Sequence, residues 1–436
     1  MTAAQAPSHQ ESTRPRESIS APRATVTARL RSSGSRLGPL PVINLVVLEI
    51  GLALGLALVT FDTGLWGPAL MLLLIAVPLA LGRWHGQWLV RWVQLGASYL
   101  VRSHGRSVTS PDPSAPAGTS AAQPDDPRVT LLRLLLPDLT IAHCADRLRE
   151  PLGLAWHQGS WTVVLEVDAG ASMIAPVGSA GGLPLGALAS CLEDRGVTLD
   201  AIQVIWHCYP GSAALPSSSP ALRSYLEVLG PLPAAARRTT WIAVRLDPRR
   251  CPDAVAERGG GVTGCHRALV GALSRVRATL ESQNVSTRPL DPDQLLRAGI
   301  SAAELSAVAG TGQPVALSEG WTAVTAAGVG HASYAITGWG VSGAVHNLNA
   351  LTGVRALSTT VALSISPGSP HEFTGAGVGE VGLRGLIRLS ARNPAELESA
   401  DGHLRTVSQR LGVALRPLGG LQAAGLAATL PLGATG

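Results

Sequence analysis

RTTWIAVRLDPRRCPDAVAERGGGVTGCHRALVGAL, residues 238–273, passes from an apolar strand through a glycine-rich loop into an amphipathic helix. We expect the strand over Thr240–Leu246, the loop to end in Gly259, Gly260 and Gly261, and the helix over Val262–Gln283. Many proteins bind a phosphate with this arrangement. The loop is long, however, and the chain has no lysine for a Walker site. We therefore expect a turn, with Thr263 capping the helix; an anion site is the alternative.

The elements around this stretch follow a repeated order. In the first half we expect a hairpin of Leu152–Trp156 and Trp161–Val167, helix Pro184–Arg195, strand Ala201–Cys208, a short helix at Ala221–Leu229, then the strand and helix above and strand Val285–Leu290. In the second half we expect strand His331–Trp339, helix Val345–Leu351, strands Ala356–Ile365 and Val381–Ser390, helix Pro394–Leu411 capped by Asn393, and strand Val413–Arg416. The predicted fold class is α+β, with a repeated βαββαβ, ferredoxin-like order or one continuous sheet.

Two apolar runs precede this soluble part. VINLVVLEIGLALGLALVT (residues 42–60) and LWGPALMLLLIAVPLALG (residues 65–82) are of near-spanning length and are separated by only four residues. Arginine is frequent before the first run and after the second, whereas the connector has only Asp62. This pattern predicts two transmembrane helices with both termini and the soluble domain in the cytoplasm. Glu49 lies inside the first span, where a carboxylate indicates either contact with a partner subunit or a tolerated group near the headgroups.

The domain boundaries follow from these shifts in composition. We expect a disordered arginine-containing tail at 1–41, the two spans at 42–82, a juxtamembrane helix at 83–102, a flexible linker at 103–128 and the soluble domain at 129–436, with halves 129–310 and 311–436.

Composition limits the chemistry. All 34 basic residues are arginine, and the net charge of +5 comes without arginine runs interleaved with aromatics, so nucleic-acid binding is not expected. The five cysteines form no CxxC pair and are expected to be reduced thiols. Lysine-dependent Schiff-base chemistry is excluded, and no GxSxG or HExxH motif is present.

Three further patterns each have an ordinary structural interpretation and a functional one. Asp291 and Asp293 form a DxD string that could hold a cation in a nucleotide-sugar transferase, although Asp-Pro is also an ordinary helix start. The glycines at 375–379 precede a strand, which is the wrong order for a dinucleotide loop. The cysteine and histidine residues lack the paired spacing of a metal site, whether they are grouped as Cys251, Cys265 and His266 or as His207 and Cys208. We therefore expect no metal and no cofactor.

The two adjacent apolar runs, the linker and the hairpin LGLAWHQGSWTVVLEV (residues 152–167) resemble the EccE component of the actinobacterial type VII (ESX) secretion system. The segment at 237–273 is similar in the same way, above all in Trp241, Arg245, Asp247, Pro248 and the three glycines 259–261. The ending LRPLGGLQAAGLAATLPLG (residues 415–433) is a less specific match.

This resemblance implies a non-enzymatic subunit at the periphery of an inner-membrane secretion complex. Its partners would be EccB-, EccC- and EccD-type subunits and the lipid bilayer, with energy supplied by the EccC ATPase for export of WxG-type substrates. The alternatives are a membrane-tethered nucleotide-sugar transferase and an anion-binding regulatory module.

Overall fold

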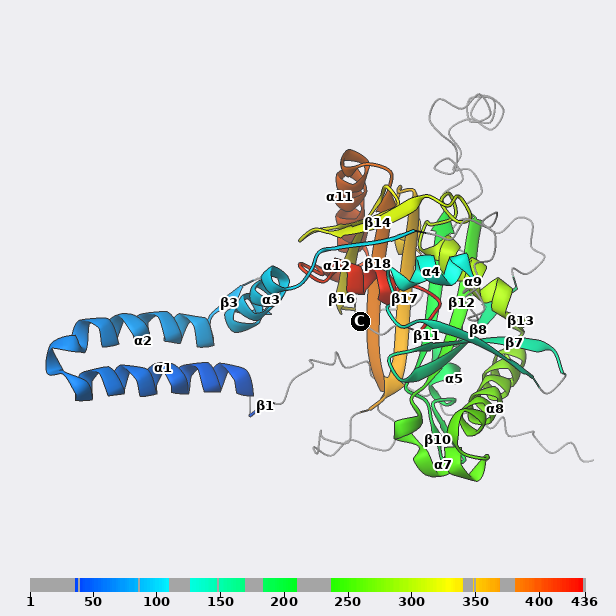
Figure 1. Ribbon diagram of the computed structural model, residues 1–436, viewed down its shortest axis with the longest axis horizontal. Coiled ribbons are helices and arrows are strands. Elements are labelled where there is room, and N and C mark those ends of the chain that lie inside the picture. Colours follow the sequence, from blue (N-terminus) through cyan, green and yellow to red (C-terminus); the bar gives the residue numbers. More distant parts are fainter. Residues whose placement is uncertain are drawn as a thin grey trace, which may run out of the picture.

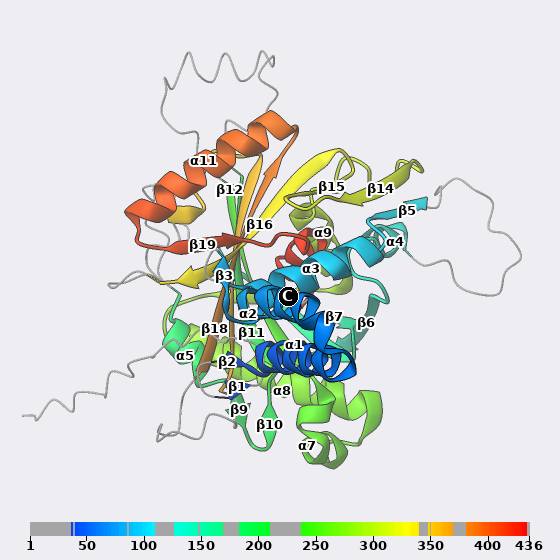
Figure 2. The ribbon, with the colours of Figure 1, turned by 90° about the vertical axis from the view of Figure 1, so that its left-hand side faces the viewer.

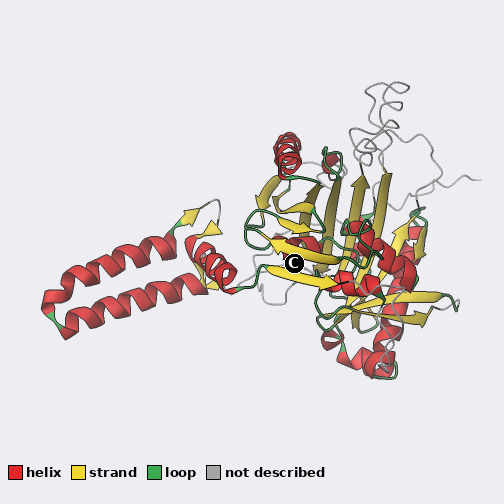
Figure 3. Cartoon of the chain, turned by 45° about the horizontal axis from the view of Figure 1, so that its top comes forward, coloured by secondary structure: helices red, strands yellow, loops and turns green. Residues whose placement is uncertain are grey.

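A computed structural model describes residues 36–37, 40–84, 87–109, 126–146, 149–168, 183–209, 237–339, 348, 350–368 and 381–433. A helical hairpin projects from one side of a large sheet that carries helices on both faces (Figures 1 and 3). The expected helices at 221–229 and, for most of its length, at 345–351 lie outside the described residues, as do the glycines at 375–379.

The projecting hairpin consists of α1 (Val42–Phe61), a short 3-10 turn η1 (Thr63–Leu65) and α2 (Trp66–Leu81). Asp62 caps the turn by accepting a hydrogen bond from the Gly64 N–H at 2.8 Å. Within the described residues, α1 alone is both long and apolar enough to cross a membrane, and α2 is a shorter apolar helix. Two-residue ribbons flank the hairpin: β1 (Arg36–Leu37) with β2 (Leu40–Pro41), and β3 (Arg83–Trp84) with β4 (Gln87–Trp88).

The chain then enters α3 (Leu89–Val101) and β5 (Gly105–Thr109). Strand β5 pairs with β14 (Pro314–Glu319) at the edge of the large sheet, with Val108 opposite Val315. Part of the expected linker at 103–128 is therefore ordered sheet, because a partner strand two hundred residues away supplies hydrogen bonds that no local pattern encodes.

In the described part of the chain the sheet has 13 strands, and each pair of neighbours is antiparallel. The main path runs β5-β14-β15-β16-β18-β17-β11-β12-β8-β7-β6, while β13 pairs with β8 and β19 with β16. The remaining bounds are β6 Thr140–Ala145, β7 Pro151–His157, β8 Ser160–Val167, β11 Ala201–Tyr209, β12 Arg237–Leu246, β13 Thr287–Pro289, β15 Val324–Ala326, β16 Val329–Gly338, β17 Ser358–Pro367, β18 Val381–Ala391 and β19 Ala414–Pro417.

The sheet joins the two halves of the soluble part. Four strands of the first half lie in the order β13-β8-β12-β11, and four of the second half lie in the order β19-β16-β18-β17. The halves meet where β11 pairs with β17, with Ile205 opposite Ala362. One continuous sheet therefore spans both halves, as one of the two expected folds predicted.

Helices cover both faces of this sheet. One core holds α5 (Leu185–Ala189), α7 (Pro252–Glu257), α8 (Gly261–Glu281) and α11 (Pro394–Arg410); the other holds α4 (Pro127–Arg133), α9 (Pro292–Ala302) and α12 (Gln422–Ala428). Strand β12 shows why two cores form, because its side chains alternate: Ile242 and Val244 belong to the first core, Trp241 and Ala243 to the second. The remaining elements are η2 (Pro248–Arg250) and the ribbon β9 (Glu193–Asp194) with β10 (Val197–Thr198).

Two local expectations were wrong. The helix expected over Pro184–Arg195 is only α5, because the chain turns at Arg195 and Gly196, whose φ angles are +46° and +75°, to form the β9–β10 ribbon. Thr263 does not cap α8: the N-cap position is Gly260, which has no side chain to accept a hydrogen bond. By contrast, Asn393 caps α11 as expected, by accepting from the Glu396 N–H at 2.8 Å.

Candidate functional site

The strand singled out by sequence, β12, lies near the centre of the sheet between β8 and β11. Trp241 is buried on the face covered by α9 and α12, and its ring stacks on that of His207 with centroids 5.8 Å apart. An aromatic pair in this position contributes to the core through burial and ring contact. Trp241 is therefore a core residue.

Arg245, four residues further along β12, joins three parts of the fold. Its Nε lies 3.0 Å from Asp200 Oδ2, Nη1 donates to the Gly433 carbonyl at 2.7 Å, and Nη2 donates to Ser160 Oγ at 3.2 Å. The side chain is only 11% exposed, so these contacts are largely shielded from water. A planar guanidinium with several fixed donors suits such a junction. Arg245 thereby ties β12 to β8 and to the end of the described chain.

Asp247 and Pro248 shape the turn after β12. The Asp247 carboxylate accepts from the Arg249 N–H at 3.0 Å and caps η2, and Pro248 begins that turn. Hydrogen bonds from the Arg249 side chain hold the pKa of Asp247 below its usual value. The next arginine, Arg250, reaches back to Asp200 Oδ1 at 3.0 Å. Asp247 is thus paired with Arg249, and Arg250 is paired with Asp200.

The glycine triplet makes the reversal between α7 and α8. Gly259, Gly260 and Gly261 have φ angles of +109°, +67° and +52°, which side-chain-bearing residues rarely adopt. Beyond them, a Cβ added at Gly264 would lie 2.3 Å from the Val255 carbonyl oxygen, so the two helices approach closely. Arg267, whose guanidinium lies beside Gly259, donates to the Arg258 carbonyl at 3.0 Å. The expected turn is confirmed.

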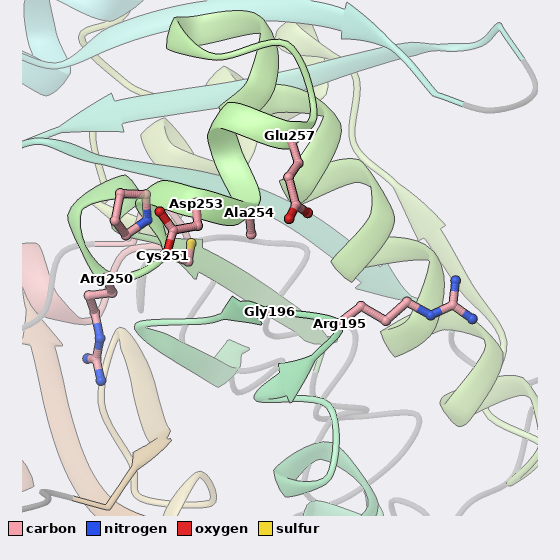
Figure 4. Close-up of a pocket in the computed structure, with 8 residues that line it drawn as sticks. Arg195, Gly196, Arg250, Cys251, Asp253, Ala254 and Glu257 are labelled. Atoms are coloured by element: carbon pink, nitrogen blue, oxygen red, sulfur yellow. The ribbon is translucent and has the colours of Figure 1, made fainter.

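Two cavities lie beside this segment. The first, of about 350 Å³, is formed by the β9–β10 turn, η2 and α7, and is lined by Arg195, Arg250, Cys251, Asp253 and Glu257 among others. Figure 4 shows the Arg195 side chain directed away from the residues of α7, and carboxylates and guanidinium groups are mixed around the rim. The second, of about 420 Å³, lies beside α8. Within the described residues, no group of three or more His, Cys, Asp or Glu side chains is arranged to hold a metal ion.

The DxD string serves the start of α9. Asp291 accepts from the Gln294 N–H at 2.7 Å, and the Gln294 side chain accepts from the Asp291 N–H at 3.1 Å, a reciprocal capping box. Asp293 pairs with Arg128 and with Arg297, each at 2.6 Å. Both carboxylates are therefore used within the fold, as expected if the motif is an ordinary helix start.

Of the cysteine and histidine residues grouped above, four are buried and one is half-buried: Cys251, Cys265, His207 and Cys208 are buried, and His266 is half-buried. All five cysteines are free thiols, and four of them are buried. Cys251 and Cys265 belong to the core beneath α8, whereas His266 packs edge-on against Trp161 with centroids 4.5 Å apart. Burial lowers the pKa of His266.

Sequence reasoning missed a contact between α3 and the sheet, which we name the clasp. It joins Trp92 and Tyr99 of α3 and the C-cap residue Arg102 to Glu319, the last residue of β14, and to Trp321 just beyond it. The Trp92 ring stacks on Trp321 at 6.2 Å and the Tyr99 ring meets it edge-on at 5.2 Å. Arg102 Nη2 lies 2.7 Å from Glu319 Oε2, and Glu319 is 6% exposed. The helical spacing of the aromatic residues was the available signal, but it does not reveal the partner.

A second group that sequence reasoning missed is a buried polar cluster at the junction of the halves: His207 (β11), Glu304 (after α9), Ser358 and Thr360 (β17) and Arg388 (β18). Thr360 Oγ1 lies 2.8 Å from His207 Nδ1 and accepts from Arg388 Nη2 at 2.9 Å, while Ser358 Oγ donates to Glu304 Oε1 at 2.5 Å.

Burial sets the ionisation of this cluster. It raises the pKa of the Glu304 carboxyl, and it lowers the pKa of Arg388 to about 10. Arg388 also donates to the Ala302 carbonyl. The cluster holds together strands from both halves of the sheet.

Comparison with known proteins identifies a family that part of the chain resembles. Residues 234–336, from β12 through α8 and α9 into β16, match the family model described as "Putative type VII ESX secretion system translocon, EccE". Over this segment the chain is similar to EccE proteins. The matched EccE region contains Trp241, Arg245, Asp247, Pro248 and the three glycines, together with Glu319 and Trp321 of the clasp.

Curated relatives agree with this family. The chain is 28% identical over 162 residues to the ESX-5 secretion system protein EccE5 of Mycobacterium marinum, covering 34% of this chain and 38% of the relative. It is 28% identical over 232 residues to EccE5 of Mycobacterium tuberculosis, covering 48% and 53%. With the ESX-1 secretion system protein EccE1 of Mycolicibacterium smegmatis it shares 41% identity over 64 residues, covering 15% and 14%. The matches thus span from about a seventh to about half of the relatives' length.

Proposed function

We propose that this EccE-type chain is a structural, non-enzymatic subunit of an inner-membrane ESX secretion complex, packed at its periphery and stabilising the assembly for export of WxG-type substrates. The observation that carries the proposal is the EccE match across residues 234–336, whose charged motif residues are engaged in turns, caps and junctions. The chain also has no lysine, so it lacks the residue that a P-loop ATPase needs. The transferase alternative has no support from Asp291 and Asp293, which are both committed to α9.

The chain is held in the bilayer by α1 and α2. Large apolar side chains on both helices are exposed, among them Leu52 at 57% and Leu70 at 50%, which is costly in water and favourable in lipid. Small residues face inward: a Cβ at Gly51 would lie 2.4 Å from Ala76 Cβ, and the Asn44 amide donates to the Ala80 carbonyl at 2.6 Å. Close approach through small residues and a polar contact is typical of helix pairs in membranes.

Helix α1 is as long as the hydrocarbon core of a bilayer is thick, whereas α2 alone is shorter. At 1.5 Å per residue, α1 is roughly 30 Å long and α2 roughly 24 Å, against a hydrocarbon core of about 30 Å. The second span can be completed by η1 and the residues after Leu81. The arginines at 83, 91, 102 and 106 support an orientation with the soluble part and both termini in the cytoplasm.

The soluble part consists of two βαββαβ, ferredoxin-like repeats joined edge to edge. Their strand orders, β13-β8-β12-β11 and β19-β16-β18-β17, correspond position by position, and the helices α8 and α11 follow equivalent strands. The pairing of β11 with β17 relates the halves by an approximate two-fold axis. Such a body offers extended scaffold surface, which suits a subunit that stabilises neighbours.

EccB-, EccC- and EccD-type subunits are the proposed partners, with Glu49 on α1 as a contact within the membrane. Glu49 is exposed on the outside of the hairpin, away from the Asn44–Ala80 contact. A carboxylate directed outward from a helix pair needs a polar partner in lipid. EccC would supply the energy for transport.

Co-purification from detergent-solubilised membranes tests the proposal. We expect the tagged chain to recover an FtsK-like ATPase and the other membrane subunits, and Glu49→Leu to reduce that recovery while Glu49→Gln retains most of it. Deleting the chain should reduce secretion of WxG-type substrates. Recovery of a lone protein that binds a nucleotide sugar would overturn the proposal.

A further inference from the structure

Helix α3 carries an apolar stripe that no described residue covers. Val93, Leu100 and Val101 are 55%, 81% and 89% exposed, and Ala97 between them is also exposed. Positions four, seven and eight residues apart share one face of a helix, so these four residues form a continuous strip. We name it the α3 stripe.

The other faces of α3 are occupied. At its start, the Leu89 N–H donates to the Gly82 carbonyl at 3.0 Å, and Val90 is buried, 4% exposed, so α3 is fixed to the end of the hairpin. On its other side, the clasp fixes Trp92 and Tyr99 to the sheet. The α3 stripe is thus held between the hairpin and the soluble domain and is directed toward neither.

The direction of α3 agrees with a helix lying on a membrane surface. Figure 2 looks along the hairpin, and in that view α3 is seen from the side, running across the hairpin axis. In Figure 1, α3 lies at the end of α2, between the hairpin and the sheet. If the hairpin crosses the bilayer, α3 lies nearly in the plane of the bilayer, at its edge.

Positive charge lies beside the α3 stripe. Between Asp62 and Asp112 the sequence has four arginines and no acidic residue. Arg91 is exposed on α3, and Arg83 lies over the Trp88 ring at 4.0 Å. Burial, and then the charge of Arg91, lowers the pKa of Arg416 on β19. Phosphate groups of lipids would pair with the exposed Arg91.

We propose that α3 is an interfacial helix, whose stripe of Val93, Ala97, Leu100 and Val101 is immersed at the boundary between headgroups and acyl chains, with Arg91 among anionic headgroups. The inference rests on the proposed transmembrane hairpin and goes beyond it, because it assigns a lipid-binding face to a helix outside the spans. Since the clasp joins α3 rigidly to the sheet, this face also sets the orientation of the sheet relative to the membrane.

Spin labels on the full chain test the inference. In a Cys144→Ser background, Leu100→Cys labels the stripe and Ser98→Cys labels the polar side of the same helix. Leu52→Cys labels the outside of α1. Each variant is reconstituted in vesicles of phosphatidylcholine and phosphatidylglycerol, and power saturation compares accessibility to oxygen, which concentrates in lipid, with accessibility to a water-soluble nickel chelate. We expect the oxygen-to-nickel ratio at position 100 to exceed that at position 98 several-fold.

The three labels separate the outcomes. A lipid signal at position 52 with a water signal at position 100 overturns the interfacial helix but leaves the hairpin. Water signals at both positions overturn both proposals. A label at position 100 that neither reagent reaches means that protein covers the stripe, which also overturns the inference.

Discussion

At the scale of single residues, Arg388 is the side chain on which the junction of the halves depends most. It is fully buried and donates to Thr360 Oγ1 and to the Ala302 carbonyl. Its positive charge partly offsets the rise that burial causes in the pKa of the Glu304 carboxyl. Replacing it by an apolar residue leaves two acceptors without their donor, and it removes a positive charge near the buried Glu304 carboxyl.

We expect Arg388→Met to lower the free energy of unfolding by about 3 kcal/mol. Arg405→Met is the matched control: Arg405 is 66% exposed and pairs with Asp401 within α11, so its loss should cost less than about 0.5 kcal/mol. Urea unfolding of the full chain in detergent measures both. Equal losses for the two variants would mean that the buried cluster contributes no more stability than an exposed ion pair.

His331 should make stability depend on pH. It is buried at the junction, with Nδ1 3.0 Å from Ser390 Oγ, and burial, with Arg388 and His207 nearby, lowers its pKa well below the usual value. The unfolded chain then binds a proton near pH 6.5 that the folded chain does not bind, so stability is lost as pH falls below that point.

The contribution of His331 is at most about 1.4 kcal/mol per pH unit. Glu304 has the opposite effect, because its pKa is raised in the folded chain. Its contribution to stability falls as pH rises above the pKa that it has in the unfolded chain. The pH dependence due to His331 must therefore be separated from that due to Glu304. We expect His331→Gln to unfold with a shallower loss between pH 6.5 and 5 than the parent chain. Identical pH profiles by circular dichroism would contradict this assignment.

At the scale of elements, the hairpin depends on close approach of α1 and α2. We expect Gly51→Ile to force the helices apart and to lower stability by about 1–3 kcal/mol, because no space exists beside Ala76. Gly67→Ile on α2 is the control, since a Cβ there meets nothing within 4 Å. Thermal unfolding in detergent should separate the two variants; a similar fall in Tm for both would argue against the tight contact.

The clasp should determine how readily α3 leaves the sheet. Glu319 accepts from Arg102 at 2.7 Å and from the Ala423 N–H at 2.9 Å, so Glu319→Leu removes two buried contacts. We expect trypsin to cleave after Arg102 roughly tenfold faster in this variant, equivalent to about 1.4 kcal/mol of lost local stability. Glu281→Leu, which affects only an exposed pair with Arg277, should cleave at the parental rate.

Local signals in the sequence were sufficient for some elements and not for others. The β7–β8 hairpin, β12, α8 and α11 were predictable because turn residues, caps and hydrophobic periodicity lie within each segment. The pairing of β5 with β14 and the clasp depend on residues some two hundred positions apart, which no local pattern connects. Sequence reasoning missed Arg388 because no local pattern indicates that an arginine inside an apolar strand will be buried.

At the scale of the whole molecule, the segment at 418–433 connects the parts. Gly420 accepts from Arg102, Gln422 accepts from the Ser333 N–H, Ala428 accepts from Gln203, and Gly433 accepts from Arg245. These partners belong to the end of α3 and to both halves of the sheet. The segment therefore couples their stabilities.

We expect Leu430→Ala, at a fully buried position, to cost about 2–5 kcal/mol and to reduce hydrogen-exchange protection in both halves, in β11 and β12 as well as in β16. Leu397→Ala on α11, which packs on the second half, should reduce protection mainly there. Loss confined to one half in the Leu430 variant would show that the segment does not couple the halves.

The position of this segment in the chain has a consequence for biosynthesis. Residues 418–433 follow every other described element in order of translation, whereas α1 and α2 precede the sheet. One face of the sheet therefore stays open on the ribosome until the segment has emerged, and by then the apolar hairpin has long been available for insertion. With the proposed transmembrane hairpin, a nascent chain would thus reach the membrane before its sheet can close.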